Sequence, residues 1–164
     1  MCIRDSFNSA YKYTSSKSFT IGEVWSNTNF VIPYVQNGRL DACFDFDLAS
    51  NIINSVNSGS SAGLQQQILT IRESYPALQF GTFLTNHDMD RVYNKLGYNN
   101  EKMKLAASIY LTMPGIPFIY YGEELGMVGT GSHENIRRPM QWSSSTYSGF
   151  TNSIPWKSIG NNYL

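Results

Sequence analysis

Four short apolar segments recur along the chain, and helical patterns separate the later ones. They begin at residues 19, 42, 82 and 117, so successive starts lie 23, 40 and 35 residues apart (42−19, 82−42 and 117−82). A unit of two parallel strands and a crossover helix takes ~30 residues or more. Strands that alternate with helices at this interval predict an α/β protein in which helices cover a parallel sheet.

The expected strands span residues 19–22, 42–46, 82–84 and 117–121. The helix between the second and third strands is expected over residues 64–75, where apolar residues recur at helical spacing, and Pro76 ends it. The next helix is expected to begin at Asn99 or Asn100, which would cap it, and to run to about Met113.

The third expected strand leads directly into a run of polar side chains. Two apolar residues, Phe83 and Leu84, are followed within seven positions by an amide, an imidazole, two carboxylates and a guanidinium. The residues of interest in this run are Asn86, His87, Asp88 and Arg91. A buried strand that surfaces into such a run predicts a polar cleft at the end of the sheet.

The first two strands also end in acids. Glu23 follows the first strand and is accompanied by Trp25, and Asp45 and Asp47 lie near the exit of the second. In parallel α/β sheets, chemistry gathers at the carboxyl ends of the strands. Glu23 and Asp88 are therefore expected at the same end of the sheet.

The composition favours a neutral partner. Twelve basic residues balance twelve acidic ones, so no net charge draws the chain to nucleic acid or to anionic lipid. Eleven Tyr, nine Phe and three Trp would suit stacking on sugars, although packing accounts for most aromatic residues. Cys43 lies in an apolar run and is expected to be a buried thiol. No apolar stretch has membrane-spanning length, and Met1 begins no signal-peptide pattern.

The chain resembles the α-amylase family of glycoside hydrolases in several segments that follow the family's order. Three of them look like the motifs at the fifth, seventh and eighth strands, namely residues 19–25, 83–88 and 115–124. A fourth resembles the segment after the eighth strand in starch-degrading and oligosaccharide-processing members, and comprises residues 137–142, 149–151 and 155–156. Each motif is weak evidence by itself, but four in register are specific.

The resemblance implies a partial (β/α)8 barrel. It supplies strands resembling the fifth to eighth with their helices, and the start of a loop-rich C-terminal extension. A complete barrel takes roughly 250 residues, so a chain of 164 with a long tail cannot close one. We expect residues 1–6 to be a non-native or disordered start, 7–126 to be the second half of the catalytic barrel, and 127–164 to be the loop-rich end of the barrel domain.

The family's chemistry gives the two acids their expected roles. Retaining hydrolysis of a glycosidic bond uses a carboxylic acid that protonates the leaving oxygen and a carboxylate ~5–5.5 Å away that forms a bond to the sugar. By resemblance, Glu23 is the acid that later acts as the base, and Asp88 is a further carboxylate that stabilises the transition state. Without the motif, Glu23 would be interpreted as a surface acid in a loop.

The family's nucleophile is an aspartate on the strand before Glu23, and the chain offers no good match for it. The acid upstream of Glu23 is Asp5, which directly follows Arg4, whereas the family places one residue between Arg and Asp. Thirteen residues, 6 to 18, separate Asp5 from the strand at residue 19, which is short for the family's helix. We expect the nucleophile to lie in a part of the parent protein that precedes this chain.

Five residues are expected to bind substrate: His87, Arg91, Trp25, Asn86 and Arg138. By resemblance, His87 would donate to sugar hydroxyls, although a lone histidine is more often a packing residue. Arg91 would orient Asp88 or contact sugar, with an ion pair at a helix start as the alternative. Arg138, together with Trp142, would line the rim of the cleft.

No cofactor or metal is expected in this segment, and any calcium would bind in the missing part of the parent. His133 and Glu134 begin like a zinc-protease helix, but the second histidine of that motif is absent. The glycine-rich stretch after residue 122 lacks the G-x-G-x-x-G spacing of a phosphate-binding loop.

We therefore expect a parent that cleaves α-1,4-glucosidic bonds in starch or malto-oligosaccharides, and a chain that is inactive alone. An α-glucosidase, an oligo-1,6-glucosidase or a trehalose-forming isomerase stays open, because the Arg-Pro-Met-Gln-Trp segment also occurs there. A non-catalytic carbohydrate-binding or interaction module is the alternative of another class, against which the retention of Glu23 and Asp88 argues. The expected partners are the glucan and the missing N-terminal half of the barrel. A starch-degrading parent favours a secreted or cell-envelope location, which is otherwise unknown.

Overall fold

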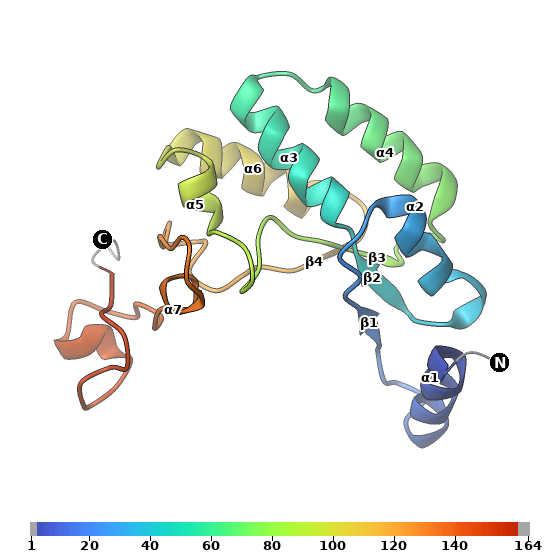
Figure 1. The fold of residues 1–164 in the computed structure, drawn as a ribbon, viewed down its shortest axis with the longest axis horizontal. Coiled ribbons are helices and arrows are strands. Elements are labelled where there is room, and N and C mark those ends of the chain that lie inside the picture. Colours follow the sequence, from blue (N-terminus) through green and yellow to red (C-terminus); the bar gives the residue numbers. More distant parts are fainter. Residues whose placement is uncertain (1–2, 161–164) are drawn as a thin grey trace.

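The computed structural model describes residues 3–160, and its centre is a four-stranded parallel sheet (Figure 1). The strands lie in sequence order, as β1 (Ile21–Gly22), β2 (Ala42–Phe44), β3 (Phe80–Thr82) and β4 (Ile116–Pro117). Each pairs in parallel with the next, for example Ile21 with Ala42. The predicted parallel α/β arrangement is confirmed.

The strands are shorter than expected, and β3 lies two residues earlier. It ends at Thr82, whereas the apolar pattern predicted residues 82–84. Phe83 and Leu84 are 3% and 1% exposed although they follow the strand. They stay buried because the chain packs against neighbouring elements as it leaves the sheet, so an apolar run extends beyond the hydrogen-bonded strand.

Helices connect and cover the strands. They are α1 (Ile3–Thr14), α2 (Thr28–Val31), α3 (Phe46–Ser58), α4 (Ala62–Ser74), α5 (Val92–Lys95), α6 (Asn100–Thr112) and α7 (His133–Ile136). Helices α4 and α6 occupy the ranges that the sequence predicts, and Asn99 caps α6 through its side chain. Helix α1 begins at Ile3, so residues 3–6 join a helix where a disordered or non-native start was expected. None of the described helices has the length and apolar character needed to cross a membrane.

Helix α3 was not predicted, and it replaces the end of the second expected strand. Asp45 is its N-cap, and the Asp45 carboxylate accepts the backbone N–H of Leu48 at 2.7 Å. The hydroxyl of Thr28 and the side-chain amide of Gln67 donate to the same carboxylate. Burial raises the pKa of Asp45, and the hydrogen bonds from Leu48 and Thr28 oppose the rise. Asp45 is therefore a buried cap that holds α2 and α4 against α3, and it does not open into a cleft.

Residues that alternate along the strands divide between two apolar clusters. The larger cluster contains Cys43 and Phe80 and the buried faces of α3, α4 and α6, with Leu48 and Ile52 fully buried. The smaller cluster gathers Phe44, Phe46, Phe83, Phe118, Ala49 and Met89. Because neighbouring residues of a strand point to opposite faces, Cys43 and Phe44 place the two clusters on opposite sides of the sheet.

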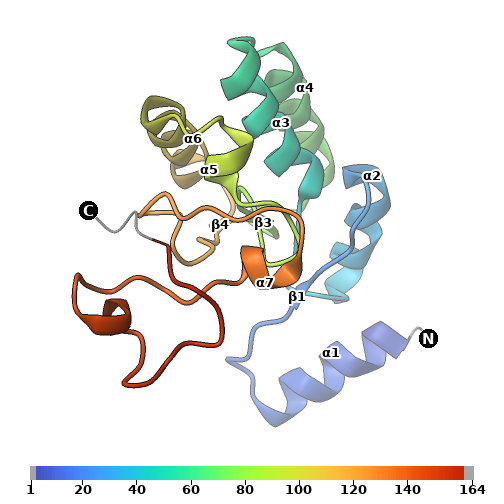
Figure 2. The same cartoon turned by 60° about the vertical axis from the view of Figure 1, so that its left-hand side comes forward.

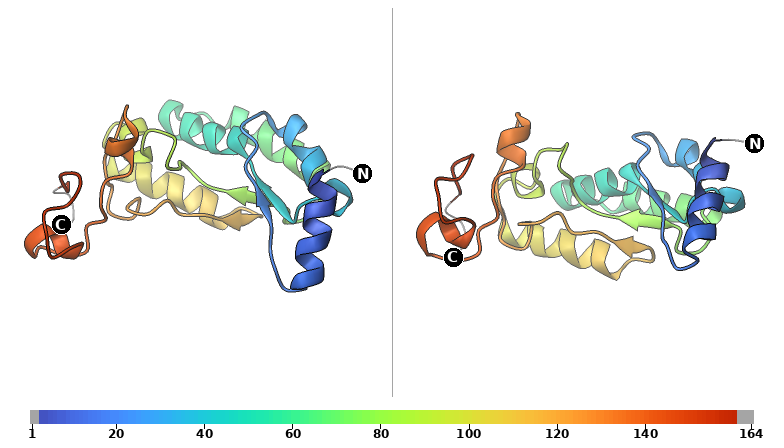
Figure 3. Two further views of the ribbon diagram at one scale, coloured as in Figure 1. Left: turned by 60° about the horizontal axis from the view of Figure 1, so that its bottom comes forward. Right: turned by 90° about the horizontal axis from the view of Figure 1, so that it is seen from below.

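The remaining segments lie at the two ends of the molecule. Helix α1 lies beside β1, away from the covering helices α3 and α4 (Figure 2). The segment that follows α7 extends from the other end, and its regular structure is the 3-10 turn Thr146–Gly149 (Figure 3). The site described next lies between these ends.

Candidate active site

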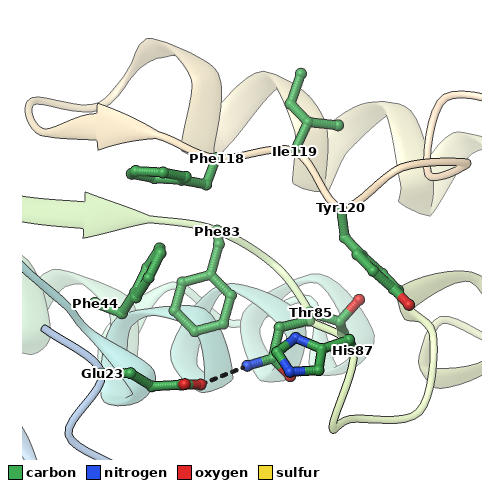
Figure 4. A pocket seen from close by; sticks show the side chains of 9 residues that line it. Glu23, Phe44, Phe83, Thr85, His87, Phe118, Ile119 and Tyr120 are labelled. Carbon is green, nitrogen blue, oxygen red and sulfur yellow. Dashed lines mark hydrogen bonds between the residues drawn. The ribbon is translucent and has the colours of Figure 1, made fainter. Parts of the chain in front are cut away.

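A cavity of 210 Å³ opens where the chain leaves the strands of the sheet (Figure 4). Its lining residues are Glu23, Phe44, Phe83, Thr85, Asn86, His87, Phe118, Ile119 and Tyr120. Aromatic and aliphatic side chains form most of the wall, and a few polar groups lie at one side. Pockets of this kind are typical of small-molecule sites, in which a few placed polar groups fix the orientation of the ligand.

A hydrogen bond joins the exits of β1 and β3 across this cavity. The side-chain amide of Asn86 donates to Glu23 Oε1 at 3.1 Å, although the two residues are 63 positions apart, and the dashed line in Figure 4 marks this bond. Asn86 Oδ1 in turn accepts the backbone N–H of Asp88 at 3.0 Å. Asn86 therefore connects the carboxylate of Glu23 to the backbone of Asp88.

Asp88 is surrounded by hydrogen-bond donors. Arg137 donates from Nη2 to Asp88 Oδ1 at 2.5 Å, and from Nε to the backbone carbonyl of His87 at 3.1 Å. Ring nitrogens of His87 and His133 lie 3.3 and 3.6 Å from the carboxylate oxygens. The Asp88 side chain remains 33% exposed, so the carboxylate is held in place and is still open to a ligand.

Sequence reasoning missed Arg137 and His133. Both come from the segment that follows β4, and Arg137 is 49 positions from Asp88. The sequence signal for Arg137 was the adjacent pair Arg137-Arg138, from which Arg138 was predicted to bind substrate. Arg138 instead donates to the backbone carbonyl and hydroxyl of Ser158 at 3.1 Å, so it anchors the C-terminal segment and does not line the cavity.

The expectation for Arg91 requires a correction. Arg91 is 1% exposed, and it donates to the backbone carbonyls of Tyr121 at 2.7 Å and Ile136 at 2.8 Å. Its guanidinium lies 4.5 and 4.7 Å from the ring centroids of Tyr120 and Tyr121. Cation–π contacts and carbonyl acceptors stabilise the charge inside the protein, so Arg91 fastens loops together, and Arg137 takes the place beside Asp88.

Trp25 lies outside the cavity wall. Its ring stacks on Phe46 with centroids 4.7 Å apart and an interplanar angle of 22°, and the residue is 60% exposed. The stacking fixes the loop after Glu23 to the start of α3 and leaves the outer ring face open. Trp142 is also exposed, on the segment after α7.

A third carboxylate, Glu123, is buried beside Thr85, which lines the cavity. It is 7% exposed, and the hydroxyl of Thr85 donates to Glu123 Oε1 at 2.9 Å. Burial raises the pKa of Glu123 to about 7, against the opposing effects of the Thr85 hydrogen bonds and the Arg91 charge. Sequence reasoning did not select this residue, although the paired acids after Gly122 were a visible signal.

Within the described part of the chain, no group of three or more His, Cys, Asp and Glu side chains could hold a metal ion. The side chain of Asp5, the poor candidate for the nucleophile, lies outside the described residues.

Comparisons with known proteins agree with this architecture. Residues 3–164 match the family model for the alpha-amylase catalytic domain. Alpha-amylase 3 of Dictyoglomus thermophilum is 39% identical over 141 residues, which cover 84% of this chain and 28% of that protein. Alpha-amylase SusG of Bacteroides thetaiotaomicron is 37% identical over 139 residues, which cover 81% of this chain and 20% of that protein. The crystal structure of an alpha-amylase from H. orenii superposes with a TM-score of 0.83 at 37% identity, over 94% of this chain and 32% of that one.

The chain therefore belongs to the alpha-amylase family of glycoside hydrolases. It spans less than a third of the length of each of these three relatives. Its four parallel strands form part of the barrel on which that family is built.

Proposed function

We propose that the protein to which this chain belongs is a retaining hydrolase of α-1,4-glucosidic bonds in starch or malto-oligosaccharides. The observation that carries the proposal is the hydrogen bond of Asn86 with Glu23, because it brings the exits of β1 and β3 to one aromatic cavity. Glu23 is then the acid and base, and Asp88 the transition-state stabiliser. The nucleophile comes from a part of the protein outside this chain.

In the first step Glu23 gives its proton to the oxygen of the leaving sugar while the nucleophilic carboxylate forms a bond to the anomeric carbon. In the second step the Glu23 carboxylate takes a proton from water, and the resulting oxygen displaces the enzyme carboxylate from the sugar. Asp88, oriented by Arg137, accepts hydrogen bonds from the hydroxyls of the distorted ring. His87 lines the cavity and provides a second polar contact, whereas Asp88 follows it in the turn and is not one of the lining residues.

The aromatic wall suits a neutral sugar. Phe44 and Phe118 lie with ring centroids 4.7 Å apart, and Tyr120 extends the wall toward the loop after β4. Such rings cover the apolar faces of a pyranose, whereas the polar groups at one side bind its hydroxyls. A chain with balanced charge fits a substrate that carries none.

The chain alone is proposed to be inactive. The nucleophile is a separate carboxylate whose loss removes the covalent step. Strands β1 and β4 are the outer strands of the sheet, and a barrel needs both of them paired.

The experiment uses the longer protein that contains this chain and measures its kcat on maltopentaose. Glu23→Gln and Asp88→Asn should each lower kcat by about 10²-fold or more, because each removes a group that acts in the transition state. Glu124→Gln is the matched control, because Glu124 is an exposed carboxylate outside the cavity, and its kcat should stay within about twofold of the unsubstituted protein. Unchanged turnover in Glu23→Gln would refute the assignment of the acid.

A further inference from the structure

The turn that carries the polar site residues, residues 85–91, is held at both ends by the segment that follows β4. At its start, the Thr85 hydroxyl donates to Glu123 at 2.9 Å. At its end, the backbone N–H of Arg91 donates to the carbonyl of Gly129 at 2.9 Å, and its side chain donates to the carbonyl of Tyr121. The turn is therefore fixed by Glu123, Tyr121 and Gly129, which are not lining residues of the cavity.

Glu123 and Arg91 are the buried charges of this contact. They are 7% and 1% exposed, and the Arg91 charge acts on Glu123 to oppose the effect of burial. Among the described residues, Glu123 Oε2 and Arg91 Nη2 are buried atoms without a hydrogen-bond partner. The Arg91 charge favours the ionised form of Glu123, whereas burial favours the neutral form and has the larger effect.

A short chain of contacts leads from Glu123 to the cavity. Thr85, which binds Glu123, directly precedes Asn86. Asn86 uses one atom of its side chain to bind Glu23 and the other to bind the N–H of Asp88. Thr85 therefore links the buried carboxyl group of Glu123 to the backbone of Asn86.

We propose that Glu123, supported by Arg91, is a positioning residue that fixes the Thr85 end of the turn and so directs Asn86 toward Glu23. The inference rests on the proposed function for the roles of Glu23 and Asp88. The inference concerns how the orientation of Asn86 depends on Glu123, and this orientation can be measured without an activity assay. Failure of the hydrolase assignment and failure of this inference are therefore separate results.

The test observes the side-chain NH2 signals of Asn86 in ¹H–¹⁵N spectra of the full chain, identified by their loss in Asn86→Asp. Thr85→Val removes the hydroxyl and keeps the shape, whereas Thr85→Ser keeps the hydroxyl. Glu123→Leu removes the acceptor, and Glu124→Leu is the matched control on the exposed neighbour. The side-chain NH2 of Asn51 in α3, which donates to the carbonyl of Asp47 at 2.9 Å, reports whether the fold is intact.

Thr85→Val and Glu123→Leu should shift the Asn86 signals toward those of a solvent-exposed amide. Thr85→Ser and Glu124→Leu should leave them in place, and the Asn51 signals should not move in any variant. The proposal is overturned if Asn86 stays in place in Thr85→Val and Glu123→Leu, or if Glu124→Leu moves it as far. Rescue by serine separates positioning by the hydroxyl from a general loss of packing.

A pH titration of the unsubstituted chain gives a second test that needs no variant. The charged and titratable groups that act on Glu123 are Arg91, Glu124 and Tyr110. The chemical shifts of the Asn86 side-chain amide should change with pH at the same midpoint as the chemical shift of the Glu123 carboxyl carbon. A midpoint that instead follows the rings of His87 and His133 would overturn the proposal, because those rings contact Asp88 directly.

Discussion

Replacement of Glu123 by glutamine is expected to remove a pH dependence from the folding stability of the chain. Burial raises the pKa of Glu123 to about 7 from an ordinary value of 4.5, although the Thr85 hydrogen bonds and the Arg91 charge oppose the rise. Glutamine keeps the size of the side chain and an oxygen that accepts from Thr85, but it cannot ionise. The substitution therefore isolates the cost of the buried charge.

The sign and the size follow from the two pKa values. Between pH 4.5 and 7 the folded chain keeps a proton on Glu123 that the unfolded chain has released, so the free energy of unfolding falls as pH rises through this window. Above pH 7 both states have lost the proton and this contribution is constant. The difference of 2.5 pKa units (7−4.5) corresponds to about 3 kcal/mol at ~1.4 kcal/mol per unit. At 7% exposure, solvent screens little of it.

Urea unfolding at pH values from 4 to 8 measures this directly. The curve for Glu123→Gln minus the curve for the unsubstituted chain should rise by about 3 kcal/mol in favour of the variant between pH 4 and pH 8. Contributions from other groups cancel in the subtraction. Glu124→Gln, at an exposed position, should give a nearly flat difference. Parallel curves for Glu123→Gln, within about 0.5 kcal/mol, would show that the burial of this carboxyl has been misjudged.

Four further substitutions test the stability of the fold around the site, each measured by urea unfolding. Leu48→Ala in α3, at a fully buried position, should cost about 2–5 kcal/mol through the cavity that it leaves, and a loss under about 1 kcal/mol would contradict the packing. Gly122→Ala should cost about 2 kcal/mol or more, because φ is +82° and the new Cβ would clash with the side chain of Met127. Gly38→Ala, with φ of +70° and open space around it, should cost about 1 kcal/mol, and equal losses at the two glycines would refute the steric argument. Asn99→Ala should cost about 1 kcal/mol by removing the cap bond to the N–H of Lys102, and no loss would show that the cap is not needed.

Local signals predicted α4 and α6 because they carry regular apolar spacing, a cap or a closing proline. Helix α3 was missed because Phe46 and Asp47 continue an apolar and acidic pattern that reads as the end of a strand. The cap at Asp45 followed by Leu48, Ile52 and Val56 was the signal that would have revealed it. The position of β3 was predicted two residues too late, because burial continues through Phe83 and Leu84 after strand pairing ends.

The residues of the site also fall into two groups, those that local sequence signals predict and those that depend on long-range contacts. Glu23, Asn86 and His87 come together because they follow parallel strands, and strand exits can be recognised in a sequence. The partners of Asp88 and Thr85 come from a loop 49 and 38 positions away. No local spacing encodes such a contact, which is why Arg137 and Glu123 were missed and Arg91 was assigned to the wrong surroundings.

The proposed mechanism is a two-step displacement in which Glu23 works as acid and base and a separate carboxylate is the nucleophile. Proton NMR of the first sugar that the longer protein releases from maltopentaose tests it most directly, because the anomeric proton shows the stereochemistry before mutarotation. A retaining enzyme should release an α-anomeric product, and this product should no longer form in Glu23→Gln. A β-anomeric product, or an α-anomeric product that still forms at the normal rate in that variant, would contradict it.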